Sequence, residues 1–290
     1  MDITEKIIDY IRTNKVSTTE VADCLGKSGV LPNIYPVNRG QFRAGRVRWI
    51  YAYDESNWSV HEMARDIQPG EIVYIEAFDC KDRAIVGELV SKFIIFYKKG
   101  AALVTNARMR DAHRLIKERY PIWCTGFSPV GCFNRKNDPP FDENIVRTRT
   151  EEMNGAVMVC DDSGVVLVPK DLLTEEFYGK LEAIEEQEDI WFDCIDRRKW
   201  DTFDTVCLKN TDNYKSGIQS GIREGKRLLC HCQYHRTGSG ASQFSRLYPS
   251  DEQVRLRIGQ HLFYVGACHQ YVHLFKFIHF RQNWLCGFQR

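Results

Sequence analysis

Residues 71–125 decide the fold, and they read EIVYIEAFDCKDRAIVGELVSKFIIFYKKGAALVTNARMRDAHRLIKERYPIWCT. Short runs rich in β-branched and aromatic residues alternate with longer apolar stretches. Gly100 separates the apolar stretch at 85–98 from the short run at 101–105. We expect strands at 71–77, 101–105 and 121–125, and helices at 85–98 and 111–119. Strand–helix alternation at this spacing predicts α/β layering with at least one pair of parallel strands.

The sequence before this segment predicts two helices and a mixed region. Apolar residues form a helical stripe at Ile3, Ile7, Ile8 and Ile11. Residues 17–20 (STTE) fit a capping box, in which a serine and a glutamate three residues later satisfy the first N–H groups of a helix. Between residues 30 and 60, glycines and prolines indicate loops between short strands.

The sequence after this segment predicts a hairpin and an acidic helix. The turn residues at 161–164 (DDSG) separate two apolar runs, 155–160 and 165–168. Residues 171–187 then show the pattern of an amphipathic helix. Charges and aromatic residues alternate at 188–209, which fits a helix that docks on the domain or on a neighbouring subunit.

Charge divides the chain close to residue 214. Residues 215–290 hold 11 Lys/Arg and 3 Asp/Glu, which leaves 40 − 11 = 29 basic and 39 − 3 = 36 acidic residues before them. Six of the eight histidines also lie after residue 215. We therefore expect a main domain at 1–187, a helical segment at 188–214, and a basic tail at 215–290 that contains His and Cys and is poorly ordered.

The chain has the composition of a soluble cytoplasmic protein. The first residues show no basic region followed by an apolar core, so we expect no signal peptide. A membrane helix needs about 18 consecutive apolar residues, and the sequence has no such run. Cysteines of the first 210 residues are scattered singly, which favours reduced thiols over a disulfide framework.

The first candidate site is Thr105–Asp111, directly after a predicted strand. Loops at the carboxyl ends of parallel strands are where α/β proteins usually bind ligands. Asp111 can hold a divalent cation such as Mg²⁺, and Arg110 offers a bidentate fork for a carboxylate or an enolate. The alternative is structural: Asp111 caps the helix that begins at residue 112, and Arg110 is solvated.

The second candidate site is the run Gly87-Glu88-Leu89-Val90 near the start of a predicted helix. Free backbone N–H groups at a helix N-terminus bind carboxylates. The alternative is an ordinary first helical turn with a favourable glutamate.

Four stretches together resemble the family of class II pyruvate aldolases that includes 4-hydroxy-4-methyl-2-oxoglutarate aldolase and the regulator of ribonuclease activity A. They occur in the order of the family and cover roughly residues 10–190. The stretches are 17–29 (STTEVADCLGKSG), 69–90 with its GELV, 104–111 running on to 128–131 (SPVG), and 155–169 (GAVMVCDDSGVVLVP).

The resemblance implies a swivelling β/β/α-type sandwich that assembles as a homotrimer or a homohexamer. It implies that Asp111 binds Mg²⁺ or Mn²⁺, that Arg110 contacts the substrate, and that the amides of Gly87–Val90 grip a pyruvyl carboxylate. The reaction would be retro-aldol cleavage of a 4-hydroxy-2-oxo acid to pyruvate, with decarboxylation of oxaloacetate as a side activity.

One departure from the family pattern keeps a second function open. Catalytic members resemble Asp-x20-Arg-Asp, whereas here the acid is Glu88, with 21 residues between it and Arg110. Glu88 is therefore our candidate for the third catalytic group, one position away from the usual acid. The alternative is a non-catalytic relative that regulates an RNA-processing enzyme.

The tail beyond residue 214 shows no resemblance to the family. Cys230, His231, Cys232 and His235 are soft metal ligands, but Cys-x-Cys is tighter than the spacing of zinc modules. Basic and aromatic residues of the tail also fit contacts with RNA. We favour a plain extension, with no zinc and no nucleic-acid partner.

Overall fold

The structure is a computed structural model that describes residues 2–211, 253–258 and 261–266. It contains two compact units, residues 1–224 and residues 225–290. Within the described part of the first unit, a mixed seven-stranded sheet has the order β1-β6-β4-β3-β2-β8-β9. Its strands are β1 (Tyr35–Pro36), β2 (Arg43–Tyr53), β3 (Ile72–Phe78), β4 (Ala102–Thr105), β6 (Ile122–Cys124), β8 (Val157–Asp161) and β9 (Gly164–Val168).

The centre of the sheet is parallel. β2, β3, β4 and β6 run in one direction, and Ile72 of β3 lies opposite Val47 of β2 and Ala102 of β4. β1 pairs antiparallel with β6, and β8 pairs antiparallel with both β2 and β9. The prediction of parallel strands within an α/β layer arrangement is confirmed.

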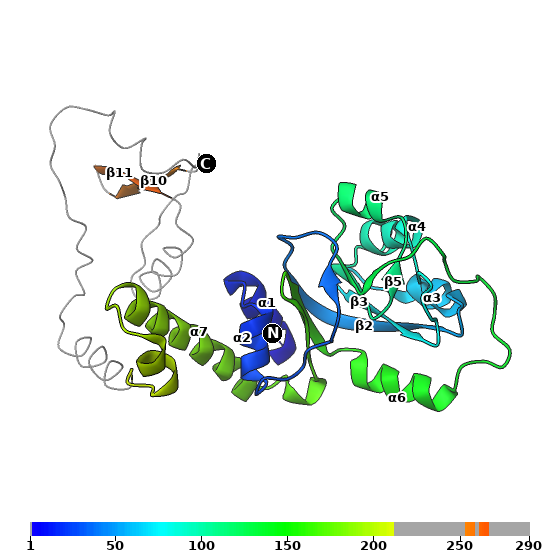
Figure 1. Ribbon diagram of the computed structural model, residues 1–290, viewed down its shortest axis with the longest axis horizontal. Helices are drawn as coiled ribbons and strands as arrows, with labels where there is room; N and C mark the ends of the chain where they lie inside the picture. Colours follow the sequence, from blue (N-terminus) through cyan, green and yellow to red (C-terminus); the bar gives the residue numbers. More distant parts are fainter. Residues whose placement is uncertain (1, 212–252, 259–260, 267–290) are drawn as a thin grey trace. The chain divides into compact units, whose positions relative to one another are not determined.

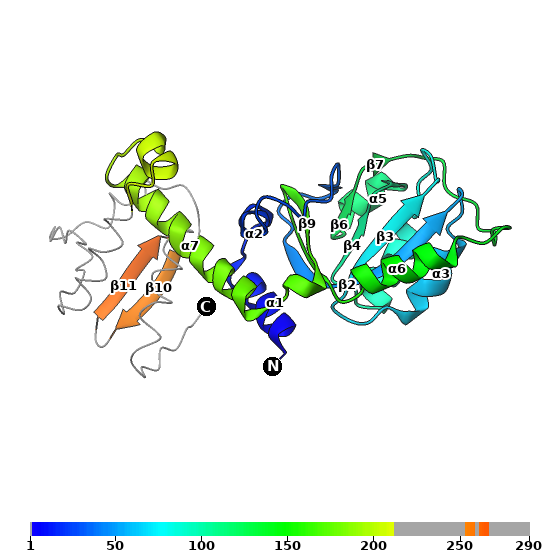
Figure 2. The same cartoon turned by 90° about the horizontal axis from the view of Figure 1, so that it is seen from below.

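Helices cover both faces of this sheet. α3 (Trp58–Met63), α4 (Glu88–Lys92) and α5 (Ala112–Lys117) lie on one face, and α6 (Glu143–Met153) lies on the other (Figure 1, Figure 2). A 3-10 turn, η1 (Ala64–Asp66), follows α3, and a π-helical turn, η2 (Phe93–Tyr97), continues α4.

Alternating side chains along the central strands explain the two layers. Ile50 and Ile75 pack with the α3–α5 layer, whereas Trp49 and Tyr74 pack with Met153 of α6. All four strand residues are at most 3% exposed. β4 and β6 are buried on both faces, so they read as continuous apolar runs rather than as an alternating pattern.

A third layer packs on the β8–β9 hairpin. It consists of α1 (Ile3–Asn14), α2 (Thr18–Cys24) and α7 (Glu175–Asp196), with the 3-10 turn η3 (Lys170–Leu172) before α7 (Figure 2). The predicted capping box is present: Ser17 Oγ accepts from Glu20 N at 3.2 Å, and Glu20 Oε2 accepts from Ser17 N at 2.6 Å. The apolar stripe of α1 is buried in this layer at Ile7, Ile8 and Ile11.

Most predicted elements appear close to their expected bounds, with two corrections. The expectation of only short strands between residues 30 and 60 was wrong, because β2 runs for 11 residues. Gly45, which we interpreted as a loop marker, lies inside β2, where a Cβ would come within 2.9 Å of the Gly70 carbonyl oxygen. The acidic helix α7 also continues past residue 187 to Asp196, and a π-helical turn, η4 (Phe203–Cys207), follows it.

In the second unit, β10 (Gln253–Ile258) and β11 (His261–Gly266) pair antiparallel as a hairpin that the sequence analysis did not predict. The candidate zinc ligands at 230–235 lie outside the described residues. No helix among the residues that the structure describes is long and apolar enough to cross a membrane.

Candidate active site

The segment between β4 and α5 lies at the carboxyl edge of the parallel strands, as predicted. β4 ends at Thr105, and a two-residue strand, β5 (Arg108–Met109), follows and pairs with β7 (Gly126–Phe127). The Asn106 side chain fixes the turn on β3, because its Oδ1 accepts from Ala77 N at 2.8 Å. The segment that carries Arg110 and Asp111 is therefore hydrogen-bonded to the edge of the sheet.

The Asp111 carboxylate caps a neighbouring helix rather than its own. Asp111 precedes α5 in a left-handed conformation (φ 59°, ψ 33°), and its side chain makes no cap bond to that helix. Its Oδ2 instead accepts from the backbone N–H of Glu88, the first residue of α4, at 3.0 Å. The alternative that Asp111 serves as the side-chain cap of the helix at 112 was wrong, and this hydrogen bond joins the two candidate segments.

Two glycines leave the space that the Arg110 side chain occupies. A Cβ on Gly87 would lie 2.2 Å from Asp111 Oδ2 and 2.7 Å from Arg110 Cγ. A Cβ on Gly131 would lie 2.8 Å from Arg110 Nη1. A Cβ on Gly87 would displace Arg110 close to its backbone, whereas a Cβ on Gly131 would meet only the flexible end of the Arg110 side chain. Glycine at position 87 therefore lets Arg110 and Asp111 pack against the start of α4. In the sequence, Gly131 stood out only as part of the 128–131 motif, and its role in the site was missed.

The predicted residues Gly87–Val90 contribute mainly backbone. Gly87 is the N-cap residue of α4, so the N–H groups of the next residues belong to its first turn, where a helix has no internal acceptors for them. The Leu89 side chain is 80% exposed, and Val90 packs against the core. The prediction of a helix start at these residues is confirmed.

The Glu88 side chain faces α5. Its Oε2 lies 3.4 Å from Nη1 of Arg114, and the Glu88 side chain is 26% exposed. The backbone N–H of Glu88 thus contacts Asp111, whereas the Glu88 carboxylate is paired with Arg114.

The charges of the site are partly exposed. Arg110 Nε lies 3.7 Å from Asp111 Oδ2, and the two side chains are 52% and 39% exposed. Exposed pairs of this kind contribute only about 0–1 kcal/mol, so both groups can exchange this contact for a ligand at small cost.

The donor set fits a cation that is held largely by water. Among the described residues, no group of three or more His, Cys, Asp or Glu side chains is placed to hold a metal ion. Asp111 provides one partly exposed carboxylate, and Mg²⁺ commonly binds one or two carboxylates while it keeps several waters.

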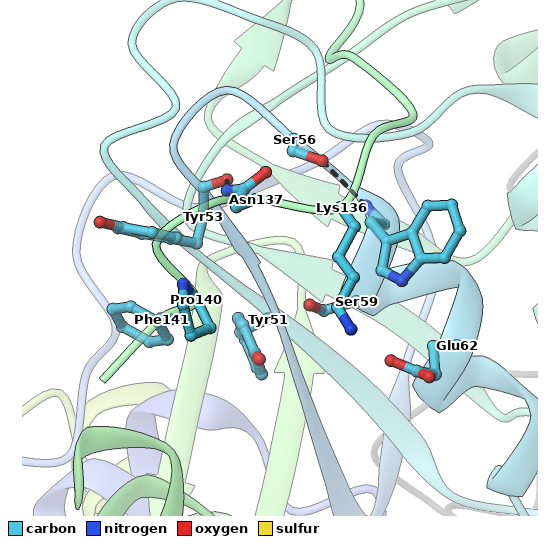
Figure 3. A pocket seen from close by; sticks show the side chains of 10 residues that line it. Tyr51, Tyr53, Ser56, Ser59, Glu62, Lys136, Asn137, Pro140 and Phe141 are labelled. Atoms are coloured by element: carbon cyan, nitrogen blue, oxygen red, sulfur yellow. Dashed lines mark hydrogen bonds between the residues drawn. The ribbon is translucent and has the colours of Figure 1, made fainter. Parts of the chain in front are cut away.

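Two hollows lie away from Arg110 and Asp111. One, of about 110 Å³, lies where β2 ends and α3 begins. Tyr53 and Phe141 line one side of it, and Glu62 lines the other (Figure 3). The rings of Tyr53 and Phe141 stack at 4.6 Å. The second, of about 830 Å³, is an open groove between α2 and α7. The sequence analysis predicted neither, because each is formed by residues far apart in the chain.

Comparison with known proteins supports this fold. A protein of Halalkalibacterium halodurans named "putative 4-hydroxy-4-methyl-2-oxoglutarate aldolase" is 24% identical over 168 residues, 56% of this chain and 78% of that protein. An uncharacterized protein from Pseudomonas syringae has a similar structure, with a TM-score of 0.53 and 20% identity over 69% of this chain and 96% of that one. RraAS2 of Streptomyces coelicolor, described as an unusual member of the RNase ES inhibitor RraA family, has a TM-score of 0.50 and 19% identity over 63% and 94%.

The mixed sheet with helices on both faces defines an α/β protein of the fold that these structures share. Residues 18–167 match the RraA-like family, described as Aldolase/RraA. The chain belongs to the RraA-like family, which confirms the resemblance of the four sequence stretches.

Proposed function

We propose that this protein is a divalent-metal-dependent lyase that cleaves a 4-hydroxy-2-oxo acid to pyruvate. One observation carries the proposal: the Asp111 carboxylate and the Arg110 guanidinium meet the N-terminus of α4 in the space that Gly87 leaves open. A carboxylate, a guanidinium and the free N–H groups of a helix, gathered in one place, can bind a small 2-oxo acid together with a cation.

Arg110 and the first turn of α4 would hold the substrate. The guanidinium is about half exposed and presents parallel N–H groups that match a carboxylate. The N–H groups of Leu89 and Val90 belong to the same turn as the amide that Asp111 uses, and they would donate to the pyruvyl carboxylate. Together these contacts would orient the 2-oxo group next to Asp111.

Asp111 would hold Mg²⁺ or Mn²⁺, mostly through water. A bound cation would supply the positive charge that polarises the 2-keto group. Decarboxylation of oxaloacetate develops negative charge at the same oxygen, so we expect it as a side activity.

Glu88 is assigned the remaining task, which is to orient the water that removes the 4-hydroxyl proton. Its carboxylate is paired with Arg114 at 3.4 Å, and Arg114 is 60% exposed. Opening so exposed a pair costs about 0–1 kcal/mol. Glu88 can therefore turn toward a bound substrate.

We further propose that the protein assembles as a homotrimer or homohexamer. Large apolar side chains beside the site face solvent, since Leu89, Phe96 and Tyr97 are 80%, 57% and 73% exposed. Grouped exposed apolar residues are typical of surfaces that another protein covers. Light scattering on the full chain would give the number of copies.

Pyruvate release from a 4-hydroxy-2-oxo diacid and from oxaloacetate, with and without Mg²⁺, tests the proposed reaction. The informative variant is Asp111→Asn, because the amide oxygen still accepts from Glu88 N but loses the charge that holds a cation. Asp82→Ala is the matched control, since this carboxylate is 88% exposed on a nearby loop and forms an ion pair with Arg108. We expect metal-dependent turnover that falls at least 100-fold in Asp111→Asn and is unchanged in Asp82→Ala. Turnover unaffected by Asp111→Asn would contradict the site assignment.

A second function has its own supporting observation. The Asp111 carboxylate already satisfies an α4 amide, and the Glu88 carboxylate is turned to Arg114. This arrangement also suits a non-catalytic relative that binds and regulates an RNA-processing enzyme. No pyruvate from either substrate at saturating Mg²⁺, together with inhibition of RNA cleavage by an RNase E-type endonuclease, would favour this second function.

A further inference from the structure

Two cysteines from distant parts of the chain meet beside the candidate site. Cys80 follows β3, and Cys132 follows Gly131, the residue that contacts Arg110. Cys132 is half-buried and Cys80 is only 4% exposed. The Cys80 thiol donates to the Phe78 carbonyl oxygen at 3.4 Å, and Cys132 packs against the apolar cluster that contains Cys80. Both are free thiols.

Backbone hydrogen bonds hold the two segments side by side. Ala84 N donates to Val130 O at 2.8 Å, and Cys132 N donates to Ala84 O at 3.1 Å. Arg83 adds a side-chain link, because its Nη1 donates to Gly131 O at 3.0 Å. The two cysteines are therefore held in neighbouring segments, with Cys132 against the apolar cluster to which Cys80 belongs.

The pair also differs chemically from the solitary buried cysteines. The hydrogen bond from Cys132 lowers the pKa of Cys80, and the same shared proton, together with burial, raises the pKa of Cys132. Burial alone raises the pKa of Cys124 to about 11, and burial also raises the pKa of Cys160. Cys80 therefore differs from Cys124 and Cys160 in having a second cysteine as its neighbour, and a lower pKa favours the thiolate, which is the reactive form.

We propose that Cys80 and Cys132 form a modification site that hydrogen peroxide converts to a reversible disulfide. In the first step the Cys80 thiolate attacks one peroxide oxygen, the O–O bond breaks, and sulfenic acid and hydroxide form. In the second step the Cys132 sulfur displaces the sulfenic oxygen, the S–O bond breaks, and the thiol proton leaves with that oxygen as water. Thiols of low molecular weight restore both cysteines by exchange.

The disulfide would join the two loops that frame Arg110. Arg83 and Gly131 lie between the cysteines and the guanidinium, and Ile85 N donates to Arg108 O at 2.9 Å, two residues before Arg110. Oxidation would therefore fix the loop against which Arg110 packs. This consequence for Arg110 rests on the proposed function, whereas formation of the disulfide does not.

Peptide mapping of the full chain tests the proposal. The protein is exposed to hydrogen peroxide, its remaining thiols are alkylated, and it is digested without reduction. We expect a peptide that joins Cys80 to Cys132 and disappears after treatment with dithiothreitol. Fragment ions must separate Cys132 from Cys124, because both lie in the tryptic peptide 120–135.

Three variants sharpen this test. Cys132→Ser should leave Cys80 as a sulfenic acid that dimedone traps, and Cys80→Ser should abolish the cross-link. Cys207→Ser, which removes an exposed thiol elsewhere, should leave it intact. Alkylation of both cysteines in oxidised wild-type protein, or a bond from Cys80 to any other cysteine, would overturn the proposal. Because the mapping of the wild-type protein needs no variant, it decides the matter even if a variant fails to fold.

Discussion

Gly87 and Gly179 lie in two regions that use backbone space for different purposes. Gly87 stands at the carboxyl edge of the parallel strands, where a Cβ would come within 2.2 Å of the Asp111 carboxylate. Gly179 stands within α7, and a Cβ there would meet nothing within 4 Å. At the edge of the sheet, the absence of a side chain on Gly87 lets the charged groups of Arg110 and Asp111 lie close together. The α1–α2–α7 layer is instead stabilised by the burial of apolar side chains. Changes in the first region should therefore affect activity, and changes in the second should affect stability.

The largest effect is expected from Gly87→Ala. The added Cβ displaces Asp111 and Arg110, and a shift of about 1 Å in such groups can lower a rate by about 100-fold. Pyruvate release by Gly87→Ala and Gly179→Ala checks this difference. Gly179→Ala should keep full activity and gain up to about 1 kcal/mol in the free energy of unfolding, because alanine is a better helix former. Equal activity in the two variants would remove the contrast.

Ile11→Ala should show the opposite behaviour. Ile11 is fully buried between α1 and the β8–β9 hairpin, so truncation should cost about 2–5 kcal/mol in the free energy of unfolding. The activity of the folded protein should not change. Urea unfolding gives the loss of stability, and Phe192→Ala, at a side chain that is 56% exposed, serves as the control. A similar loss in both variants would mean that burial is not what holds this layer.

A smaller loss is expected from Ser17→Ala. This change removes the acceptor for Glu20 N, and loss of an N-cap side chain costs about 1 kcal/mol. Thr19→Ala, at an exposed position of the same turn, should have little effect on urea unfolding. An unchanged midpoint for Ser17→Ala would show that the capping box forms without stabilising α2.

The smallest effect concerns the pH dependence of the α2–α7 region. Burial, and then the charges of Glu20 and Asp23, raise the pKa of Glu188 above its ordinary value of 4.5. An acid with a raised pKa in the folded state opposes folding when it is ionised. This penalty is absent below pH 4.5, and it appears in full only above the raised pKa. Glu188→Gln should therefore stabilise the protein at about pH 7 and lose that advantage as the pH falls toward about 4, which urea unfolding at each pH would measure. A benefit that does not depend on pH would contradict the assignment of charge as its cause.

The sequence predicted local features better than contacts between distant residues. The capping box at Ser17, the stripe of α1 and the strands β3 and β4 follow from patterns within a few residues, and the structure contains all of them. The length of β2 was missed, because Gly45 serves a contact with Gly70 that no local pattern records.

For the candidate site, the sequence proposed residues but not the contacts between them. Arg110, Asp111 and the Gly87–Val90 turn were proposed partly through the family resemblance, and their functional roles stay predictions. The hydrogen bond from Glu88 N to Asp111 and the contact between Gly131 and Arg110 depend on how separate loops pack, so the sequence alone could not supply them.

Binding of Mn²⁺, measured by electron paramagnetic resonance on the full chain, tests the central claim most directly. Mn²⁺ would be titrated into the wild type, Asp111→Asn and Asp82→Ala, with pyruvate present and absent. We predict that Asp111→Asn weakens binding at least tenfold, that pyruvate tightens it only where Asp111 is intact, and that Asp82→Ala behaves like the wild type. Equal Mn²⁺ affinity in the wild type and Asp111→Asn would contradict the assignment of a metal-dependent site to Arg110 and Asp111.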